Sequence, residues 1–316
     1  MGNQRPDSES KAVAYLDLLG FSELVRRNLR EATSLIENYN DVLAATVCHE
    51  RPSDKGTPSS GKPAPERLRR LLYFLPMSDS VFAVSVEPGT LVEFLVGFLA
   101  DTYLYTAQAY SQPEGHDDPT RVTVSEASST GIGQRGEKWP PTLFRGGLAY
   151  GKVLVLRQLA IREGADEPCY NLAGAAVIEA IQLEKKKKGP LVLCSQHFAY
   201  EVPGPIRRYI SNMEHGFHEI LWPMSRLEGS NGGVDPLQFR TFFGSAANLY
   251  KAFAKHNYSS HYAEFLRLVV RSAVTLGVYA SSKAAVTRHI EQAAREHGVL
   301  FLVKDLIRDG TKTGSA

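Results

Sequence analysis

Cysteine is scarce in this sequence, with three residues in 316, and the three are far apart with no CxxC pair. This spacing excludes a disulfide framework and a cysteine-rich zinc site, and it indicates a reducing compartment with buried thiols. Long apolar runs are missing as well. The stretch 91–100 ends before Asp101, and the stretch 265–280 contains two arginines. Neither reaches the roughly 20 apolar residues of a membrane span.

A strong net charge is also absent. The 36 lysines and arginines nearly balance the 34 acidic residues, and the net charge of +2 gives no electrostatic case for general nucleic-acid binding. The first ten residues are polar and lack the apolar core of a signal peptide, so we expect a cytoplasmic protein. The composition, 43% hydrophobic and 22% charged, is typical of a globular chain. Its length suggests one domain plus an accessory segment.

The hydrophobic pattern predicts a mixture of strands and helices. We expect strands at 11–16, 69–76, 80–86, 190–195, 208–210 and 217–221, and two more in a hairpin around Gly151 within 143–156. We expect helices at 22–47, 89–110, 171–187 and, in about three pieces, 236–300. Loops are expected at 50–66, at 111–141 with a short strand at 122–124, and from 157 to Tyr170. This order predicts an α+β sandwich with one mostly antiparallel sheet.

Two aspartates are notable because each lies beside an apolar strand. Asp17 ends the first predicted strand in KAVAYLDLLGFS, and Asp79 lies between two strand-like runs in PMSDSVFAVS. If the two strands are neighbours, both carboxylates lie at one edge of the sheet and can share a divalent metal ion, which prefers oxygen ligands. An Asp before a helix is also a favourable N-cap, so a purely structural role is the alternative for Asp17.

Four segments, in this order, resemble the catalytic domain of the class III nucleotidyl cyclases. AYLDLLGFS resembles the family's first strand and metal-binding turn, and YFLPMSDSVFAV its hairpin with the second metal aspartate. LFRGGLAYGKV resembles its RxGIxxG hairpin, and YNLAGAAVIEAIQLE its GxxVNxAxRLE helix. The resemblance implies a ferredoxin-like sheet with helices. The motif variants DLLGF, SDS and FRGG are most similar to those of the bacterial pyrimidine cyclases of Pycsar antiphage systems. Those enzymes make cyclic UMP or cyclic CMP as an alarm signal.

The resemblance also implies cofactors, partners and site residues. Two Mg²⁺ or Mn²⁺ ions would be held by Asp17, Asp79 and the Leu18 carbonyl. Backbone N–H groups of the turn Leu19-Gly20-Phe21, at the start of a helix, would bind the nucleotide phosphates. A homodimer with active sites at the subunit interface is implied, as is a separate effector protein that senses the cyclic nucleotide. The expected division is a disordered N-terminus at 1–10, a catalytic domain at 11–225 and a C-terminal helical segment at 236–305.

The fourth motif departs from the family at two positions. Ile178 stands where the family has Asn, and Gln182 stands where it has the Arg that stabilises the transition state, so Gln182 is kept as a substrate-binding candidate. A missing cation at developing phosphate charge removes a large electrostatic contribution. Lys186, one helical turn beyond Gln182, and Arg145 are the candidates to replace it. The alternatives are a solvated helix end for Lys186 and a structural ion pair for Arg145.

Recognition of the base is predicted from few residues. Purine cyclases that use ATP carry a Lys four residues before the second Asp and an Asp seven residues before the helix Asn. Those positions are Leu75 and Asn171 here. The missing Lys argues against adenine contacts, and Asn171 offers both a donor and an acceptor to the edge of uracil or cytosine. Tyr73 offers stacking surface, with an ordinary core position as its alternative.

These features lead us to expect a two-metal pyrimidine nucleotide cyclase that converts UTP to 3′,5′-cyclic UMP and pyrophosphate. UTP is preferred to CTP on the resemblance alone. A purine cyclase is one alternative. The other is a catalytically silent cyclase-like domain that binds nucleotide and regulates a partner. The losses at Ile178 and Gln182 favour the silent domain, whereas the retention of Asp17 and Asp79 opposes it.

Overall fold

The computed structural model describes most of the chain. The described residues are 9–27, 71–107, 121–128, 131–138, 141–162, 165–212, 216–230, 232–255, 259–280 and 283–312, with the single positions 29, 32, 33, 36 and 39. The predicted loop at 50–66, most of the predicted N-terminal segment and the end of the first predicted helix lie outside them.

The centre of the fold is a seven-stranded sheet in the order β10-β11-β9-β6-β1-β3-β2. Its strands are β1 (Ser10–Leu18), β2 (Tyr73–Met77), β3 (Ser80–Ser85), β6 (Phe144–Lys152), β9 (Val192–Ser195), β10 (Ile210–Asn212) and β11 (Phe217–Ile220). Every neighbouring pair is antiparallel except β6 and β9. The mostly antiparallel sheet predicted from the sequence is therefore confirmed.

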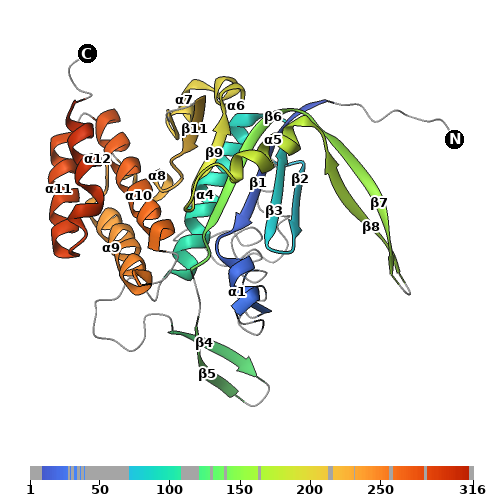
Figure 1. Ribbon diagram of the computed structural model, residues 1–316, viewed down its shortest axis with the longest axis horizontal. Coiled ribbons are helices and arrows are strands. Elements are labelled where there is room, and N and C mark those ends of the chain that lie inside the picture. The colour runs from blue at the N-terminus through green and yellow to red at the C-terminus, as the bar shows by residue number, and fades with distance from the viewer. Residues whose placement is uncertain are drawn as a thin grey trace.

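Helices cover both faces of this sheet (Figure 1). They are α1 (Phe21–Arg27), α4 (Pro88–Thr106), α5 (Ala175–Glu184), α6 (Gln196–Glu201), α7 (Gly204–Arg207), α8 (Met224–Leu227), α9 (Pro236–Phe253), α10 (Ser259–Tyr279), α11 (Lys283–Glu296) and α12 (Leu300–Lys312). The chain order β1-α1-β2-β3-α4-β6 with the strand order β6-β1-β3-β2 is a ferredoxin-like arrangement. The α+β class is thus confirmed.

The alternation of side chains along β1 explains why two layers of helices are needed. Ala12, Ala14 and Leu16 belong to the large core that contains α4, whereas Val13 belongs to a second core on the opposite face, under α5. Because successive residues of a strand point to opposite faces, a strand that is apolar throughout must be covered on both sides. β1 is therefore the buried middle of the sheet.

The structure corrects the prediction of a hairpin around Gly151 and of a loop up to Tyr170. β6 runs through Gly151 to Lys152, and the chain then leaves the sheet at Val153. The next strand, β7 (Leu154–Arg162), pairs with β8 (Ala165–Ala173) and not with β6. Figure 1 shows this long two-stranded arm extending away from the body. Glycine allowed a turn at 151 in the sequence, but it allows a continuous strand equally well.

Two further predictions need correction. The helix predicted from Asn171 begins after Gly174, because Asn171 is part of β8. In the C-terminal region, α9, α10 and α11 are the three pieces predicted within 236–300, and α12 extends beyond that range. The predicted loop at 111–141 contains a hairpin of β4 (Arg121–Ser128) and β5 (Gly131–Lys138), so the short strand expected at 122–124 is confirmed and is longer than expected. No described helix combines the length and apolarity that a membrane crossing requires.

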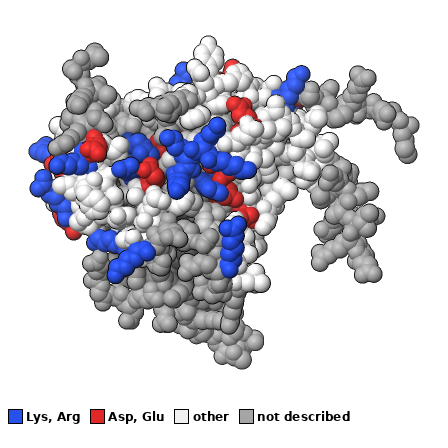
Figure 2. Space-filling model, viewed as in Figure 1, with Lys and Arg blue, Asp and Glu red and all other residues white. Residues whose placement is uncertain are grey.

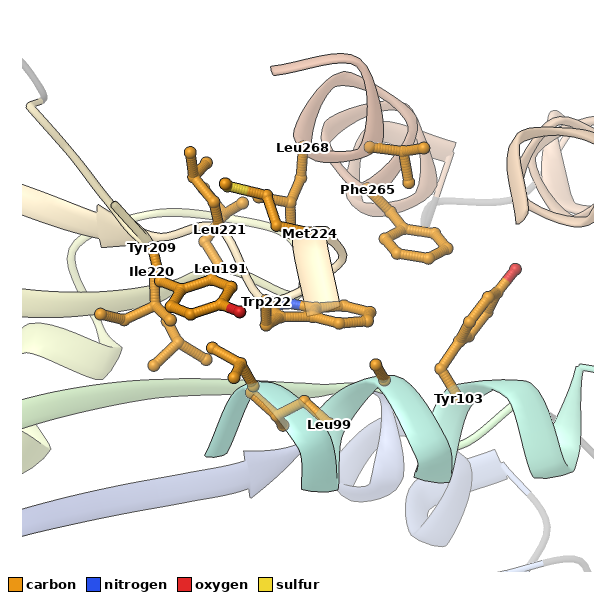
Figure 3. Close-up of a cluster of buried hydrophobic side chains, with 14 of the residues drawn as sticks. Leu99, Tyr103, Leu191, Tyr209, Ile220, Leu221, Trp222, Met224, Phe265 and Leu268 are labelled. Carbon is orange, nitrogen blue, oxygen red and sulfur yellow. The ribbon is translucent and has the colours of Figure 1, made fainter. Parts of the chain in front are cut away.

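The C-terminal helices share the core of the sheet. Trp222, just before α8, stacks on Phe265 of α10 with ring centroids 5.6 Å apart and an interplanar angle of 12°. Tyr103 of α4 packs edge-on against Phe265 at 4.7 Å. Figure 3 shows these rings between α4 and α10. One continuous cluster of buried side chains therefore joins the sheet, α4 and α9 to α12.

A buried ion pair joins the same two parts of the chain. Arg271 of α10 donates two hydrogen bonds to Glu219 of β11, at 2.6 and 2.9 Å. The Glu219 side chain is 1% exposed, whereas Arg271 is 21% exposed. A carboxylate at this depth is stable only while a cation faces it. Arg271 is therefore required for α10 to dock on β11.

We predict that Arg271→Ala lowers the free energy of unfolding by about 3–5 kcal/mol, because it leaves Glu219 charged and unpaired in the core. Arg267→Ala is the matched control on the same helix, since Arg267 pairs with the more exposed Glu264 and donates to the Leu302 carbonyl oxygen at 3.1 Å, and it should cost about 2 kcal/mol or less. Denaturant unfolding followed by circular dichroism measures both. Equal losses for the two variants would contradict the assignment.

On the opposite face of the sheet, a close approach between α5 and β6 determines how the helix packs. A Cβ atom on Gly147 would lie 2.1 Å from the Ala180 carbonyl oxygen. A Cβ atom on Gly151, in the same strand, would meet only Ala176, at 3.8 Å. α5 therefore rests directly on the backbone of β6 at Gly147, and its distance from the sheet depends on that missing side chain.

We predict that Gly147→Ala destabilises the protein by at least about 1–3 kcal/mol, because backbone must move to admit the methyl group. Gly151→Ala should stay within about 0.5 kcal/mol of the wild type, since its methyl group meets ordinary van der Waals distances. The midpoints of thermal unfolding distinguish the two. If both variants have the same midpoint of thermal unfolding, α5 does not rest on Gly147.

Candidate active site

Two of the predicted metal residues lie together at one end of the sheet. Asp17 is opposite Ser80 in the β1–β3 register, and Asp79 is the residue before Ser80, in the β2–β3 turn. The Leu18 amide donates to the Asp79 carbonyl oxygen at 2.9 Å, which ties the two segments directly. The Ser80 hydroxyl donates to Asp17 Oδ1 at 3.4 Å and is itself bonded to the Tyr15 hydroxyl at 3.0 Å. The predicted pairing of these strands is confirmed.

Arg145 lies beside the same carboxylate, from the other neighbouring strand. It is opposite Asp17 in the β1–β6 register. Its Nε and Nη2 atoms donate to Asp17 Oδ2 at 3.0 and 2.9 Å. Nε also lies 2.5 Å from Oε1 of Glu184, the last residue of α5. The ion pair that was the structural alternative for Arg145 is therefore present, and it is made with a predicted metal ligand.

The electrostatics of this end of the sheet reflect buried negative charge. Burial raises the pKa of Asp79 above the ordinary aspartate value, and the negative charge of Asp17 raises it further. Burial likewise raises the pKa of Glu184, although Arg145 opposes the shift. Tyr39 also has a raised pKa, through burial first and then through Asp79 and Asp17. These acids repel one another, and Arg145 balances only part of their charge.

Asp17 and Asp79 fit a divalent cation. Carboxylate oxygens are the ligands that Mg²⁺ and Mn²⁺ prefer, and Mg²⁺ in particular is often held by only one or two carboxylates together with substrate phosphates. A cation between the two acids would also remove the repulsion that raises the pKa of Asp79. Over the described ranges, no group of three or more His, Cys, Asp or Glu side chains could hold a metal ion. The remaining ligands would come from backbone carbonyls such as that of Leu18, from water or from a phosphate.

The predicted phosphate-binding turn is formed, with one amide already in use. Gly20 has a φ of +88°, a conformation that glycine adopts readily, and α1 begins at Phe21. The Leu19 amide donates to the Leu143 carbonyl oxygen at 2.8 Å, so it serves the fold and is not available for a phosphate. The backbone amides of Gly20 and Phe21 remain the predicted phosphate-binding groups.

Three other predicted residues lie in or just after α5. Lys186 falls beyond the end of α5, and its Nζ atom lies 5.9 Å from the centre of the Phe217 ring. The expectation that it continues the helical stripe of Ile178 and Gln182 is therefore wrong, although its proposed role as a cation stays untested. Ile178 is 58% exposed and Gln182 is also exposed.

The predicted base-recognition residues form a second group. Tyr73 pairs with Val84, at the opposite end of β2 from the Asp79 turn. At ~3.3 Å per residue, Tyr73 lies about 13 Å along the strand from Met77, the residue at the turn end of β2. Its ring centre lies 5.9 Å from that of Tyr170 in β8. The next residue, Asn171, accepts a hydrogen bond from the Leu172 amide at 2.8 Å. One chain therefore does not bring this second group to the carboxylates.

The sequence analysis missed two residues near the carboxylates. Glu184 is the last residue of the fourth motif, so its position in that motif was an available signal. His261 of α10 gave no signal, because it lies in the helical segment outside the resemblance. Its Nδ1 atom accepts a hydrogen bond from the Gly189 amide at 2.9 Å. Burial, followed by the charges of Arg145 and Lys188, lowers its pKa. The C-terminal helices thus reach the turn that follows α5.

Comparison with known proteins gives cyclase domains at low similarity. No protein-family profile and no curated protein matches the sequence. Among solved structures, the adenylyl cyclase CyaB from P. aeruginosa is 15% identical, covers 68% of this chain and 95% of its own, and has a TM-score of 0.41. An adenylate cyclase from Trypanosoma brucei is 12% identical, with 67% and 88% covered and a TM-score of 0.38. The guanylate cyclase domain from Catenaria anguillulae is 16% identical, with 67% and 94% covered and a TM-score of 0.38. These values assign the chain to no family.

The raised pKa of Asp79 predicts a pH dependence of stability. The folded state binds this proton more tightly than the unfolded chain, so the free energy of unfolding falls as the pH rises from the ordinary aspartate range through the raised pKa. Without metal, Asp79→Asn should therefore gain stability relative to the wild type across that window and keep the gain above it. Denaturant unfolding in EDTA over a pH series measures the difference. The control is Asp305→Asn, on the exposed surface of α12; parallel curves for wild type and Asp79→Asn would refute the prediction.

Proposed function

We propose that this protein is a metal-dependent pyrimidine nucleotide cyclase that converts UTP to 3′,5′-cyclic UMP and pyrophosphate. The observation that carries the proposal is the register of β1, which lies between β3 and β6 and so brings Asp17 beside both Asp79 and Arg145. Two carboxylates and a guanidinium at one sheet end are the groups that phosphoryl chemistry with divalent ions requires. The four sequence segments that resemble class III cyclases contain all three residues.

The reaction is an internal displacement at the α-phosphorus. The ribose 3′-oxygen forms the new bond to the α-phosphorus, the bond from that phosphorus to the bridging oxygen of pyrophosphate breaks, and the 3′-hydroxyl proton leaves to solvent. Two bound Mg²⁺ or Mn²⁺ ions would lower the pKa of the 3′-hydroxyl and neutralise charge on the phosphates. Asp17 and Asp79 are the carboxylate ligands for those ions.

The chain's own residues would bind and orient the triphosphate. Arg145 presents a planar guanidinium, which matches phosphate oxygens better than a lysine does. The amides of Gly20 and Phe21 face the start of α1, where the helix dipole favours negative charge. The buried hydroxyl of Tyr39 lies close enough to both aspartates to feel their charge and has no hydrogen-bond partner among the described residues, so it is a further donor for a ligand oxygen at this site.

A homodimer is proposed because the base-recognition group is separated from the carboxylates. Tyr73 lies about 13 Å along β2 from the end that carries the Asp79 turn and contacts Tyr170, the residue before Asn171. A second copy that docks on the same face would place its own base-recognition group against the carboxylates of the first. The exposed apolar side chains of Leu156, Tyr170 and Ile178 suit such an interface.

Uracil is the proposed base because Leu75 replaces the lysine of purine cyclases and Asn171 replaces an aspartate. The product is proposed as a second messenger for antiphage defence, made in the cytoplasm and sensed by a separate effector protein. A cytidylate cyclase and a purine cyclase share the same metal site and differ only in the base group. A catalytically silent nucleotide-binding regulator is the second candidate, favoured by Ile178 and Gln182 in place of the family's Asn and Arg.

Each nucleoside triphosphate, incubated separately with the purified protein and Mn²⁺ or Mg²⁺, tests the proposal by mass spectrometry of the products. We expect cyclic UMP and pyrophosphate from UTP, and a loss of at least about 100-fold in rate for Asp17→Ala, because a principal metal ligand is removed. Asp305→Ala, on the exposed surface of α12, is the matched control and should retain full activity.

The other outcomes separate the rival functions. Cyclic CMP or a cyclic purine nucleotide as the main product would transfer the assignment to that base. Nucleotide binding with Mn²⁺ but no cyclic product from any of the four would support the silent regulator. Product formation that is unchanged in Asp17→Ala would refute the metal site.

A further inference from the structure

Arg145 is shared between two carboxylates that compete for one hydrogen. Its Nε atom carries a single hydrogen, and that hydrogen is donated to Asp17 Oδ2 at 3.0 Å. Nε also lies 2.5 Å from Oε1 of Glu184. Oε1 of Glu184 has no hydrogen-bond partner among the described residues. Glu184 is therefore in direct contact with Arg145, but the single Nε hydrogen is already donated to Asp17.

Glu184 is an unusual place for such an unsatisfied acceptor. Its side chain is 3% exposed, whereas those of Asp17 and Arg145 are 16% and 34% exposed. Leaving a buried carboxylate oxygen without a hydrogen bond is costly, and the cost is greatest when the group is charged. The seating of α5 on Gly147 fixes the end of the helix, so Glu184 has little freedom to find another donor.

Asp17 has two competing partners in the proposed reaction. In the protein alone its Oδ2 atom accepts both hydrogen bonds from Arg145. A divalent ion at Asp17 would compete for the same carboxylate and would repel the guanidinium. Arg145 must then find another acceptor or swing toward solvent, where it no longer faces the site.

We propose that Glu184 is a positioning residue that takes over Arg145 when a divalent ion occupies Asp17, and so holds the guanidinium beside the bound phosphates. The inference rests on the proposed metal site and deepens it. The transfer requires only a small rotation of the guanidinium, because Nε is already in contact with Glu184 Oε1. Metal binding at Asp17 and the ion pair between Arg145 and Glu184 should therefore strengthen each other.

A double-mutant cycle on Mn²⁺ affinity, measured without nucleotide, tests this coupling. The four proteins are the wild type, Glu184→Gln, Arg145→Gln and the double variant, and titration calorimetry gives the affinities. If Arg145 moves onto Glu184, the loss of Mn²⁺ affinity caused by Glu184→Gln should be about fivefold or more larger with Arg145 present than without it. Additive effects would mean that the contact is the same with and without metal, and would overturn the proposal.

A second readout follows Arg145 directly and needs only a conservative variant. The ¹⁵N-labelled Nε–H signal of Arg145, assigned by its absence in Arg145→Lys, is recorded during a titration with diamagnetic Mg²⁺. In the wild type the signal should shift and stay protected from exchange with water, whereas in Glu184→Gln it should exchange once Mg²⁺ is bound. The same response in both proteins would overturn the proposal, and this comparison decides alone if Arg145→Gln does not fold.

The failure of this inference and the failure of the proposed function give different results. A protein that makes no cyclic nucleotide but shows the coupling refutes the cyclase and retains the transfer of Arg145. An active cyclase with additive affinities retains the function and refutes the transfer. A wild-type protein that binds no Mn²⁺ at all refutes both.

Discussion

The register of β1 between β3 and β6 is the constraint on which the rest of the structure depends. It sets Asp17 opposite Ser80 on one side and opposite Arg145 on the other. A slip of one residue would turn Asp17 to the face that α4 covers, and would also exchange Ala14 and Leu16 with Val13 and Tyr15 between two cores. Because a slip would bury the Asp17 carboxylate in the core under α4 and would mismatch the side chains of both cores, packing fixes the register, and the register fixes the site. Fold and chemistry depend on the same packing.

The second constraint is the distance between α5 and β6, because it brings Glu184 to Arg145. Gly147 lets the helix backbone rest on the strand, and the helix then ends at Glu184 beside the sheet end that carries Asp17. The C-terminal helices contact the turn after α5 through the hydrogen bond from the Gly189 amide to His261. They also dock on β11 of the sheet, through Arg271 and Glu219. The helical segment therefore supports the candidate site from outside the residues that resemble a cyclase.

The features that depend on local sequence pattern could be predicted. The strands around Asp17 and Asp79 could be identified because apolar alternation is strong there, and two neighbouring strands then require their ends to meet. The path of the chain after Gly151 could not be predicted, because a glycine in a strand fits both a turn and a continuous strand. In addition, β7 pairs with the next strand of its own arm and not with the central sheet. Glu184 and His261 escaped prediction for another reason. Their importance depends on contacts between segments that are far apart in the chain, Glu184 with Arg145 and His261 with Gly189.

The balance of charge at the site limits what it can bind. Asp17, Asp79 and Glu184 face one guanidinium, so a triphosphate that approached them without further cations would be repelled. Divalent ions at the two aspartates, as proposed, would reverse this balance. Lysines 185–188, which follow α5, are exposed, and the charge of Lys185 acts on Glu184. Figure 2 shows basic side chains next to acidic ones near the middle of the view. An acidic site repels an anion until cations neutralise it. In the proposed reaction, metal ions would therefore have to reach the two aspartates before the triphosphate or together with it.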